Sequence, residues 1–220
     1  MESRHQTYLF AHQNAQAAHH PYKLPVDYKT ECMEGKLPIH PTICYSDDAL
    51  RKYFNRVKNA DWYENTVFII TADHTAQSVD KKYGSSKGIY AIPLVIFDPS
   101  NTVHQLIKNT TQQADITPTA LDYLGIPVDM IAFGQSALNA NQDGFSVSYL
   151  SGLYQLIRNE HTILFDGEKL VSAYYNDDNQ LKTRFIQKPT KAINESEEKL
   201  KAIIQAYNDR MINNKLTVDD

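Results

Sequence analysis

An aspartate and a histidine lie side by side shortly after a short apolar run. The run Val67–Ile70 is β-branched and aromatic, and Asp73 and His74 follow it closely. Such a run is typical of a strand buried on both faces of a parallel sheet. In open α/β sheets, ligands bind outside the carboxyl ends of the strands, where these two residues would then lie. A carboxylate beside an imidazole suits a divalent ion such as Zn²⁺ or Mn²⁺, so the sequence predicts a metal site at Asp73 and His74.

The same pair has a second interpretation without chemistry. An aspartate at a strand end can cap the next segment, and the histidine beside it can be an ordinary surface residue. Thr71 and Thr75 flank the pair, but a hydroxyl needs a metal or an adjacent base to become a nucleophile. The sequence contains no GxSxG elbow, no Walker loop and no GxGxxG motif. The residues by themselves therefore identify no nucleophile and leave both interpretations open.

A second candidate is the segment AHHPYKLP, which contains His19 and His20. The two histidines follow a predicted strand and a polar turn, so they could lie at the same sheet edge as Asp73. A neutral imidazole can bind a metal, and an imidazolium can neutralise an anionic oxygen. The alternative is a solvated loop whose histidines cap backbone groups, and for His20 this alternative is favoured. Lys87 is a further candidate for contact with an anionic substrate, or else a packing residue.

Composition narrows the class of protein. The chain has 220 residues, 42% hydrophobic residues and a formal net charge of −4. This is enough for one core of ordinary size, and the charge gives no electrostatic case for a nucleic-acid partner. No apolar run approaches the ~20 residues of a membrane span, and the first residues lack a secretory signal. Cys32 and Cys44 lie in one proline-containing loop, where they could pair in an oxidising compartment.

The first part of the chain contains strands, a long loop and a helix. Residues 8–11 predict a strand, and the proline-containing residues 12–45 predict a long irregular loop. Ser46 is expected to cap a helix, because acidic residues follow it in the first turn. Residues 94–97 predict a further strand. Together these elements predict an α/β fold, with a layered sheet flanked by helices over residues 1–145.

Residues 146–220 are expected to form an antiparallel hairpin and a terminal helix within the same domain. Residues 154–175 alternate β-branched and aromatic side chains around Asp166 and Gly167, which indicates a hairpin. Asn194 with Glu197 three residues later is typical of a capping box at the start of a helix.

Four blocks of sequence together resemble a known family. They are LFAHQNAQAAHHPYKLP, YSDDALRKYFNRVKNADWYENTVFIITADH, GIYAIPLVIFDP and QQADITPTALDYLGIP. In order and spacing they resemble the second half of a sulfatase-type catalytic domain, nearest to the lipoteichoic acid synthase-like phosphoglycerol transferases of the alkaline phosphatase superfamily. The resemblance covers most of residues 7–215. In the block around Asp115, the segment 115–125 predicts a helix that ends at Gly125.

The resemblance implies an extracytoplasmic, metal-dependent domain with a threonine nucleophile. By position, Asp73 and His74 match the metal-binding Asp-His pair of the family. His19 matches the histidine that helps to hold the phosphate or the leaving group, while Asp115 and Thr119 match a structural helix. Mn²⁺ is the expected ion, with Mg²⁺, Zn²⁺ and Ca²⁺ as alternatives. The implied substrate is an anionic lipid or another phosphate or sulfate ester.

The chain also departs from the family pattern. In the family the nucleophilic threonine and the acidic metal ligand lie upstream, in a half-domain that is expected to precede residue 1, after a membrane-spanning region. We therefore expect a C-terminal portion of one catalytic domain over residues 1–220, from a membrane-anchored protein of the bacterial envelope, with the other half-domain as its partner. The alternative is a non-catalytic α/β module that retains Asp73 and His74. The sequence does not distinguish phosphate from sulfate esters.

Overall fold

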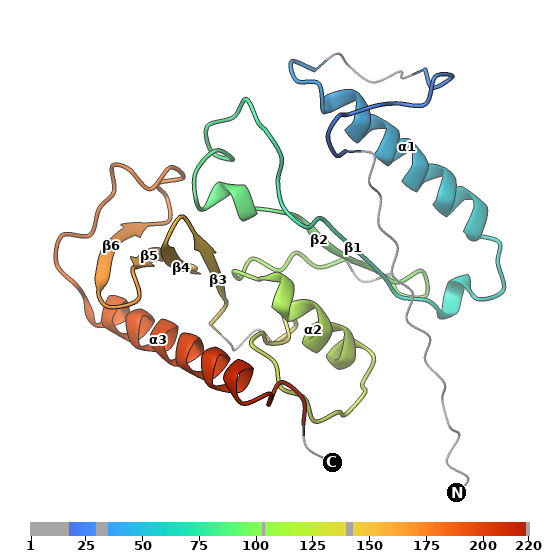
Figure 1. The fold of residues 1–220 in the computed structure, drawn as a ribbon. Helices are drawn as coiled ribbons and strands as arrows, with labels where there is room; N and C mark the ends of the chain where they lie inside the picture. The colour runs from blue at the N-terminus through green and yellow to red at the C-terminus, as the bar shows by residue number, and fades with distance from the viewer. Residues whose placement is uncertain (1–17, 30–34, 103, 140–142, 219–220) are drawn as a thin grey trace, which may run out of the picture. The chain divides into compact units, whose positions relative to one another are not determined.

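The structure is a computed structural model that describes residues 18–29, 35–102, 104–139 and 143–218 (Figure 1). It separates into two units, each of which is described by itself. The first unit comprises the described residues up to Thr71 together with residues 77–79 and 94–102. The second unit includes residues 72–76, 80–93 and everything after residue 103 that the structure describes. The expected extent of one domain over residues 1–220 stays a prediction.

The first unit contains the helix α1 (His40–Val57), the short 3₁₀ turn η1 (Tyr63–Asn65) and the strands β1 (Phe68–Thr71) and β2 (Leu94–Phe97). The two strands pair antiparallel, with Phe68 opposite Phe97 and Thr71 opposite Leu94. The prediction of a parallel neighbour for this run was therefore wrong. A run of apolar residues indicates that a strand packs against other parts of the protein. It does not indicate whether the neighbouring strand is parallel or antiparallel.

Aromatic side chains cover the paired strands of the first unit. The Phe54 ring of α1 lies 5.0 Å from the Phe68 ring and 5.6 Å from the Phe97 ring, measured between centroids. Tyr63 of η1 lies 5.8 Å from Phe68. Edge-on and tilted ring contacts of this kind add to the burial of apolar surface. They explain why the run at β1 is so rich in large apolar residues, although these residues are only partly buried.

The helix α1 begins at His40, not at Ser46, so the predicted cap was wrong and residues 40–45 are not a loop. Pro41 lies in the first turn, where its missing N–H leaves no intrahelical bond unmade. Ser46 instead lies inside the helix and donates to the carbonyl oxygen of Thr42 at 3.0 Å. Cys44, also inside α1, is disulfide-bonded. The other cysteine, Cys32, and the predicted strand at residues 8–11 lie outside the described residues.

The second unit is built on an antiparallel sheet in the order β3-β4-β5-β6. Its strands are β3 (Phe145–Leu150), β4 (Leu153–Arg158), β5 (His161–Phe165) and β6 (Leu170–Tyr175). The predicted hairpin at Asp166 and Gly167 is confirmed, and Gly167 has a φ of 103°, which favours glycine. A second hairpin, which the sequence analysis did not predict, turns at Ser151 and Gly152.

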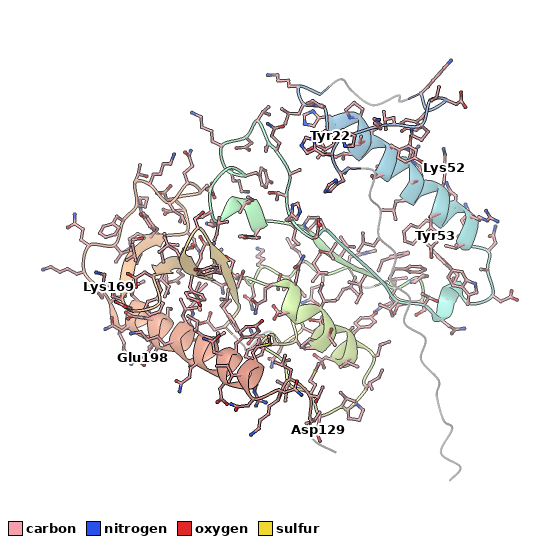
Figure 2. The ribbon with its side chains drawn as sticks, in the orientation of Figure 1. Tyr22, Lys52, Tyr53, Asp129, Lys169 and Glu198 are labelled. Carbon is pink, nitrogen blue, oxygen red and sulfur yellow. The ribbon has the colours of Figure 1, made fainter. Side chains whose placement is uncertain are left out.

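The helix α3 (Lys191–Ile212) packs against this sheet (Figure 1). Thr190 is its N-cap and accepts a hydrogen bond from the N–H of Ile193, so the predicted start at Asn194 was wrong. Ile193 and Leu200 are buried, whereas Glu198 projects into solvent (Figure 2). The buried core of the unit comprises Phe145, Leu156, Ile163, Phe165, Ala173, Ile193 and Leu200. No helix among the described residues combines the length and the apolar composition needed to cross a bilayer.

A shorter helix completes the second unit. The helix α2 (Ile116–Tyr123) follows the 3₁₀ turn η3 (Gln113–Asp115), and a further 3₁₀ turn, η2 (Gly88–Tyr90), precedes β2. The predicted helix over residues 115–125 is thus confirmed. Gly125 follows its end with a φ of 64°, a common way for a helix to stop.

Candidate metal site

Asp73 and His74 lie in the turn that follows β1. Their side chains are 87% and 61% exposed, respectively, so a ligand can reach both. The N–H of His74 donates to Oδ1 of Asp73 at 2.9 Å. Asp73 therefore does cap the following residue, as the interpretation without chemistry expected. Because this bond uses Oδ1 only, the cap leaves Oδ2 for another partner.

The imidazole of His74 has a defined orientation. Its Nδ1 lies 2.7 Å from the carbonyl oxygen of Thr75. A carbonyl oxygen can only accept, so Nδ1 carries a proton, and in the neutral ring Nε2 then has the lone pair that can bind an ion. Nε2 lies 3.5 Å from Oδ2 of Asp73. Metal-binding histidines commonly donate their other N–H to a backbone carbonyl in this way.

These two donors fit a divalent ion. Two ligands each about 2.1 Å from one ion at a tetrahedral angle lie roughly 3.4 Å apart, close to the separation seen here. A carboxylate oxygen and an imidazole nitrogen suit Mn²⁺ or Zn²⁺. Within the part of the chain that the structure describes, no cluster of three or more His, Cys, Asp or Glu residues could hold a metal. The described residues thus provide a partial donor set.

The backbone of the turn is held by Gln113, a residue of η3. Its Nε2 donates to the carbonyl oxygen of Ala72 at 3.0 Å and to that of Asp73 at 2.8 Å. The sequence analysis did not single out Gln113. Nothing in its residue type or its neighbours indicates contact with a turn 40 residues earlier in the chain.

Thr75 holds the turn from its other end. Both its N–H and its hydroxyl donate to the carbonyl oxygen of Ile89, at 3.1 and 2.8 Å. The hydroxyl proton is thus engaged in closing the loop that runs from Thr75 to Ile89. This contact gives Thr75 a structural role. Thr71, the other hydroxyl near the pair, is paired with Leu94 in the first unit.

The loop after Thr75 is anchored on the C-terminal sheet and its connections. Lys87 donates from Nζ to the carbonyl oxygen of Asn176 at 2.6 Å, and burial is the main cause that lowers its pKa. Ser85 donates to the carbonyl oxygen of Asn179 at 2.8 Å. Lys87 is therefore a packing residue here, which was one of its two interpretations.

His19 belongs to the first unit, whereas Asp73 and His74 belong to the second. Its Nδ1 lies 3.0 Å from the carbonyl oxygen of His20, and the residue is exposed. This is the backbone contact expected for a histidine in a solvated loop. Each unit is described by itself, so a position of His19 facing Asp73 stays a prediction.

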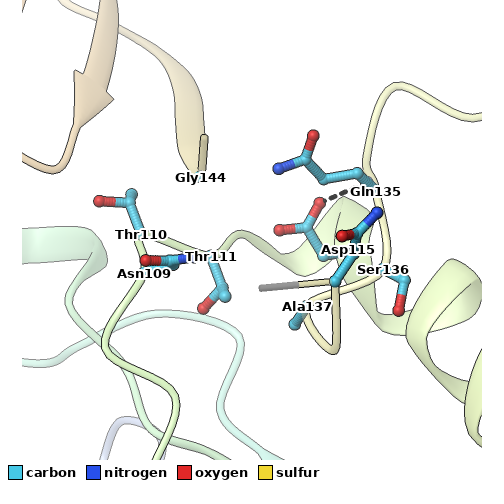
Figure 3. Close-up of a pocket in the computed structure, with 9 residues that line it drawn as sticks. Asn109, Thr110, Thr111, Asp115, Gln135, Ser136, Ala137 and Gly144 are labelled. Carbon is cyan, nitrogen blue, oxygen red and sulfur yellow. Dashed lines mark hydrogen bonds between the residues drawn. The ribbon is translucent and has the colours of Figure 1, made fainter. Parts of the chain in front are cut away.

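Asp115 and Thr119 stabilise the segment around α2. Asp115 is buried, and its carboxylate accepts from the N–H groups of Gln112 and Gln135 at 2.9 and 2.8 Å. Figure 3 shows the bond with Gln135. Thr119 accepts from the N–H of Ala137 at 2.9 Å. The cavity beside Asp115 has a volume of about 10 Å³, which is room for roughly one water molecule. These contacts give both residues a structural role.

A comparison with protein families decides the class of this chain. The sulfatase family model matches residues 9–126, which is more than half of the chain. The chain belongs to the sulfatase family. The matched region contains the Asp-His pair, Gln113 and the helix α2.

Curated relatives of this sulfatase-family chain come from different branches. Arylsulfatase K of Canis lupus familiaris is 28% identical over 47% of this chain and 20% of its own length. The multifunctional alkaline phosphatase superfamily protein PehA of Trinickia caryophylli is 31% identical over 42% of this chain and 19% of its own length. The lipoteichoic acid synthase-like YvgJ of Bacillus subtilis (strain 168) is 24% identical over 54% of this chain and 22% of its own length. The chain thus spans about a fifth of each of these relatives.

Solved structures show the same fold. A protein of the alkaline phosphatase superfamily from Vibrio parahaemolyticus matches with a TM-score of 0.70 and 19% identity, over 92% of this chain and 49% of that structure. The lipoteichoic acid synthase LtaP of Listeria monocytogenes matches with a TM-score of 0.69 and 20% identity, over 93% of this chain and 53% of that structure. The predicted α/β fold of the alkaline phosphatase type is therefore confirmed.

Proposed function

We propose that this sulfatase-family chain provides part of a metal-dependent site for the transfer or hydrolysis of phosphate or sulfate esters at the bacterial cell envelope. The observation that carries the proposal is the pair of exposed donors, with Nε2 of His74 3.5 Å from Oδ2 of Asp73. Membership of the sulfatase family and the similarity to a lipoteichoic acid synthase-like protein support the class of reaction.

Each residue of the site has its own proposed role. Asp73 and His74 would hold the ion, which we propose to be Mn²⁺, and when bound the ion supplies charge stabilisation for an ester oxygen. Nδ1 of His74 keeps its proton and donates it in a hydrogen bond to the carbonyl oxygen of Thr75, so the neutral ring presents only Nε2 to the site. The proposal assigns no nucleophile to this chain. In the family pattern the nucleophilic threonine precedes the four blocks found here.

His19 is proposed to contact the anionic substrate, an envelope lipid or another phosphate or sulfate ester. The parent protein is proposed to be membrane-anchored, with the domain outside the cytoplasm. The genomic DNA immediately upstream of Met1 checks the assignment of the nucleophile. An in-frame segment with an acidic residue at a strand end and a threonine that opens a helix would support it.

A titration of the 220-residue chain with Mn²⁺ tests the metal site. We expect weak binding, because two protein ligands leave most of the coordination shell to water. Asp73→Ala and His74→Ala should each abolish it. Asp129→Ala is the matched control, since it removes an exposed carboxylate outside the site (Figure 2). Tight binding that survives Asp73→Ala would refute the assignment.

The alternative function is a non-catalytic module that retains the pair. The capping bond from the N–H of His74 to Asp73 is the observation that favours it, because this bond needs no metal. On this alternative, Mn²⁺ should affect wild type and Asp73→Ala equally. Both proposals, the partial metal site and the non-catalytic module, predict the same result in assays of the 220-residue chain against p-nitrophenyl phosphodiesters and p-nitrophenyl sulfate. Wild type should show no turnover above that of Asp73→Ala. Clear turnover that Asp73→Ala abolishes would instead place a nucleophile within this chain.

A further inference from the structure

Both N–H groups of the Gln113 side-chain amide bind the turn that carries Asp73 and His74. The amide nitrogen has two protons, and the carbonyl oxygens of Ala72 and Asp73 accept one each, at 3.0 and 2.8 Å. Because both acceptors are carbonyl oxygens, the nitrogen end of the amide must face the turn. Gln113 thus fixes the peptide groups on both sides of the Cα atom of Asp73.

The two candidate metal ligands depend on this backbone for their positions. Their side chains are largely exposed, so surrounding packing does little to hold them. The turn is held from one side by Gln113 and from the other by the two bonds from Thr75 to Ile89. Since Asp73 and His74 lie between these two attachments, loosening either one lets the donor atoms move apart.

We propose that Gln113 is a positioning residue for the metal site: it holds the backbone from which Oδ2 of Asp73 and Nε2 of His74 reach the same ion. The inference rests on the proposed function for its metal. Partners outside the first ligand shell of metal sites commonly affect affinity about 10- to 100-fold. Gln113 does this through the backbone, and it does not itself touch the ion.

The neighbouring Gln112 provides a matched control. Its Nε2 donates to the carbonyl oxygen of Phe133 at 3.2 Å, and its Oε1 accepts from the N–H of Val147 at 3.1 Å. Gln112→Met therefore removes these two hydrogen bonds, and also the capping bond that the Gln112 side chain accepts from the N–H of Asp115, without touching Ala72 or Asp73. Gln113 is itself exposed, so Gln113→Met should fold.

The test compares Mn²⁺ binding by wild type, Gln113→Met and Gln112→Met in the 220-residue chain. We expect about 10-fold weaker binding in Gln113→Met, at the lower end of the range for such partners, and a change of less than about two-fold in Gln112→Met. Equal binding by Gln113→Met and wild type would overturn the inference. So would equal weakening in both variants, because that would indicate general loosening of η3.

A measurement without metal separates this inference from the proposed function. Hydrogen exchange at the N–H of Thr75 should be about five-fold faster in Gln113→Met, because the turn opens more often once it is held from one side only. If wild type shows no Asp73-dependent Mn²⁺ binding while this exchange still accelerates, the metal assignment fails and the positioning of the turn stands. If the exchange rate is unchanged in Gln113→Met, the positioning role is refuted.

Discussion

Ser86 and Gln155 exchange two hydrogen bonds although 69 positions separate them in the sequence. The hydroxyl of Ser86 donates to Oε1 of Gln155 at 2.9 Å, and Nε2 of Gln155 donates to the carbonyl oxygen of Ser86 at 3.1 Å. Gln155 lies on β4 and is only 3% exposed. The loop that follows the candidate metal site is thus attached to the C-terminal sheet by a buried side chain.

Replacing this glutamine should weaken the second unit. Gln155→Leu removes both bonds, and also the one from Nε2 to Oγ of Ser148 at 3.3 Å, and it leaves the carbonyl oxygen of Ser86 without this donor. The free energy of unfolding should therefore fall by about 2 kcal/mol. Urea unfolding measures the loss. The control is Gln187→Leu at an exposed position, where a change within about 0.5 kcal/mol is expected. Equal losses in the two variants would contradict the role given to Gln155.

Asp178 should make stability depend on pH in the acid range. Its carboxylate accepts from the N–H groups of Arg184, Thr183, Lys182 and Gln180, and these bonds hold its pKa far below the ordinary value of 3.8. As the pH falls through 3.8, the unfolded chain takes up a proton that the folded chain does not, so this contribution is present above pH 3.8 and is lost below it.

The substitution Asp178→Asn tests this dependence. The variant should be less stable than wild type at neutral pH, because an amide cannot accept the same set of bonds, and the difference should shrink as the pH falls toward about 3. Asp177→Asn is the matched control, since the Asp177 carboxylate is 62% exposed and pairs with Arg184 at 3.2 Å. A difference between wild type and Asp178→Asn that stays constant from pH 7 to about 3 would contradict the prediction.

His161 should also make stability depend on pH, in this case near neutral pH. Its Nε2 lies 2.7 Å from Oγ of Ser196, which donates its own proton to the carbonyl oxygen of Ala192 and therefore accepts from the imidazole. Burial, and next the charge of Arg158, lower the pKa of His161 below 6.5. The unfolded chain then binds a proton more readily, so stability should fall as the pH drops below 6.5.

Unfolding of His161→Gln between pH 7.5 and 5.5 checks this effect. As the pH falls over this range, the free energy of unfolding should decrease less in the variant than in wild type, because the variant lacks the contribution of His161. His104→Gln, which replaces an exposed histidine, should keep the wild-type slope. If His161→Gln and wild type have equal slopes, the imidazole is not the group responsible.

Gly134 lies too close to the backbone of the 3₁₀ turn η3 to carry a side chain. A Cβ atom there would lie 2.2 Å from the carbonyl oxygen of Ala114 and 2.7 Å from the backbone nitrogen of Asp115. Gly134→Ala should therefore lower the free energy of unfolding by about 2 to 3 kcal/mol. Gly84→Ala is the control, because the nearest atom to its Cβ would be the carbonyl oxygen of Lys81 at 3.7 Å. In thermal unfolding, Gly134→Ala should lose more stability than Gly84→Ala.

The parts of the fold that local chemistry determines could be predicted from the sequence. The strand after Pro93 has the predicted bounds Leu94–Phe97, and the turn at Asp166 and Gly167 is where glycine was expected to permit it. The predicted starts of two helices were wrong, because in each case more than one residue could mark the boundary of the helix. Pro41 suggested a loop but lies in the first turn of α1, and Asn194 suggested a cap that Thr190 provides.

The candidate site was only partly predictable for a different reason. Adjacent residues such as Asp73 and His74 are necessarily close, so their pairing needed no knowledge of the fold. The contact of Gln113 with the carbonyl oxygen of Asp73 spans 40 positions, and no local pattern encodes it. The antiparallel direction of β1 relative to β2 is also a long-range property, which an apolar run does not determine.

The aromatic cluster of the first unit gives the chain a natural optical probe. Trp62 is the single tryptophan of the sequence, and its ring lies 6.5 Å from that of Phe68. At 47% exposure its emission should shift when this cluster opens. Tryptophan fluorescence therefore follows the first unit alone, whereas far-ultraviolet circular dichroism follows both units, because each contains a long helix. Denaturation followed by both signals would show whether the two units melt together or in turn.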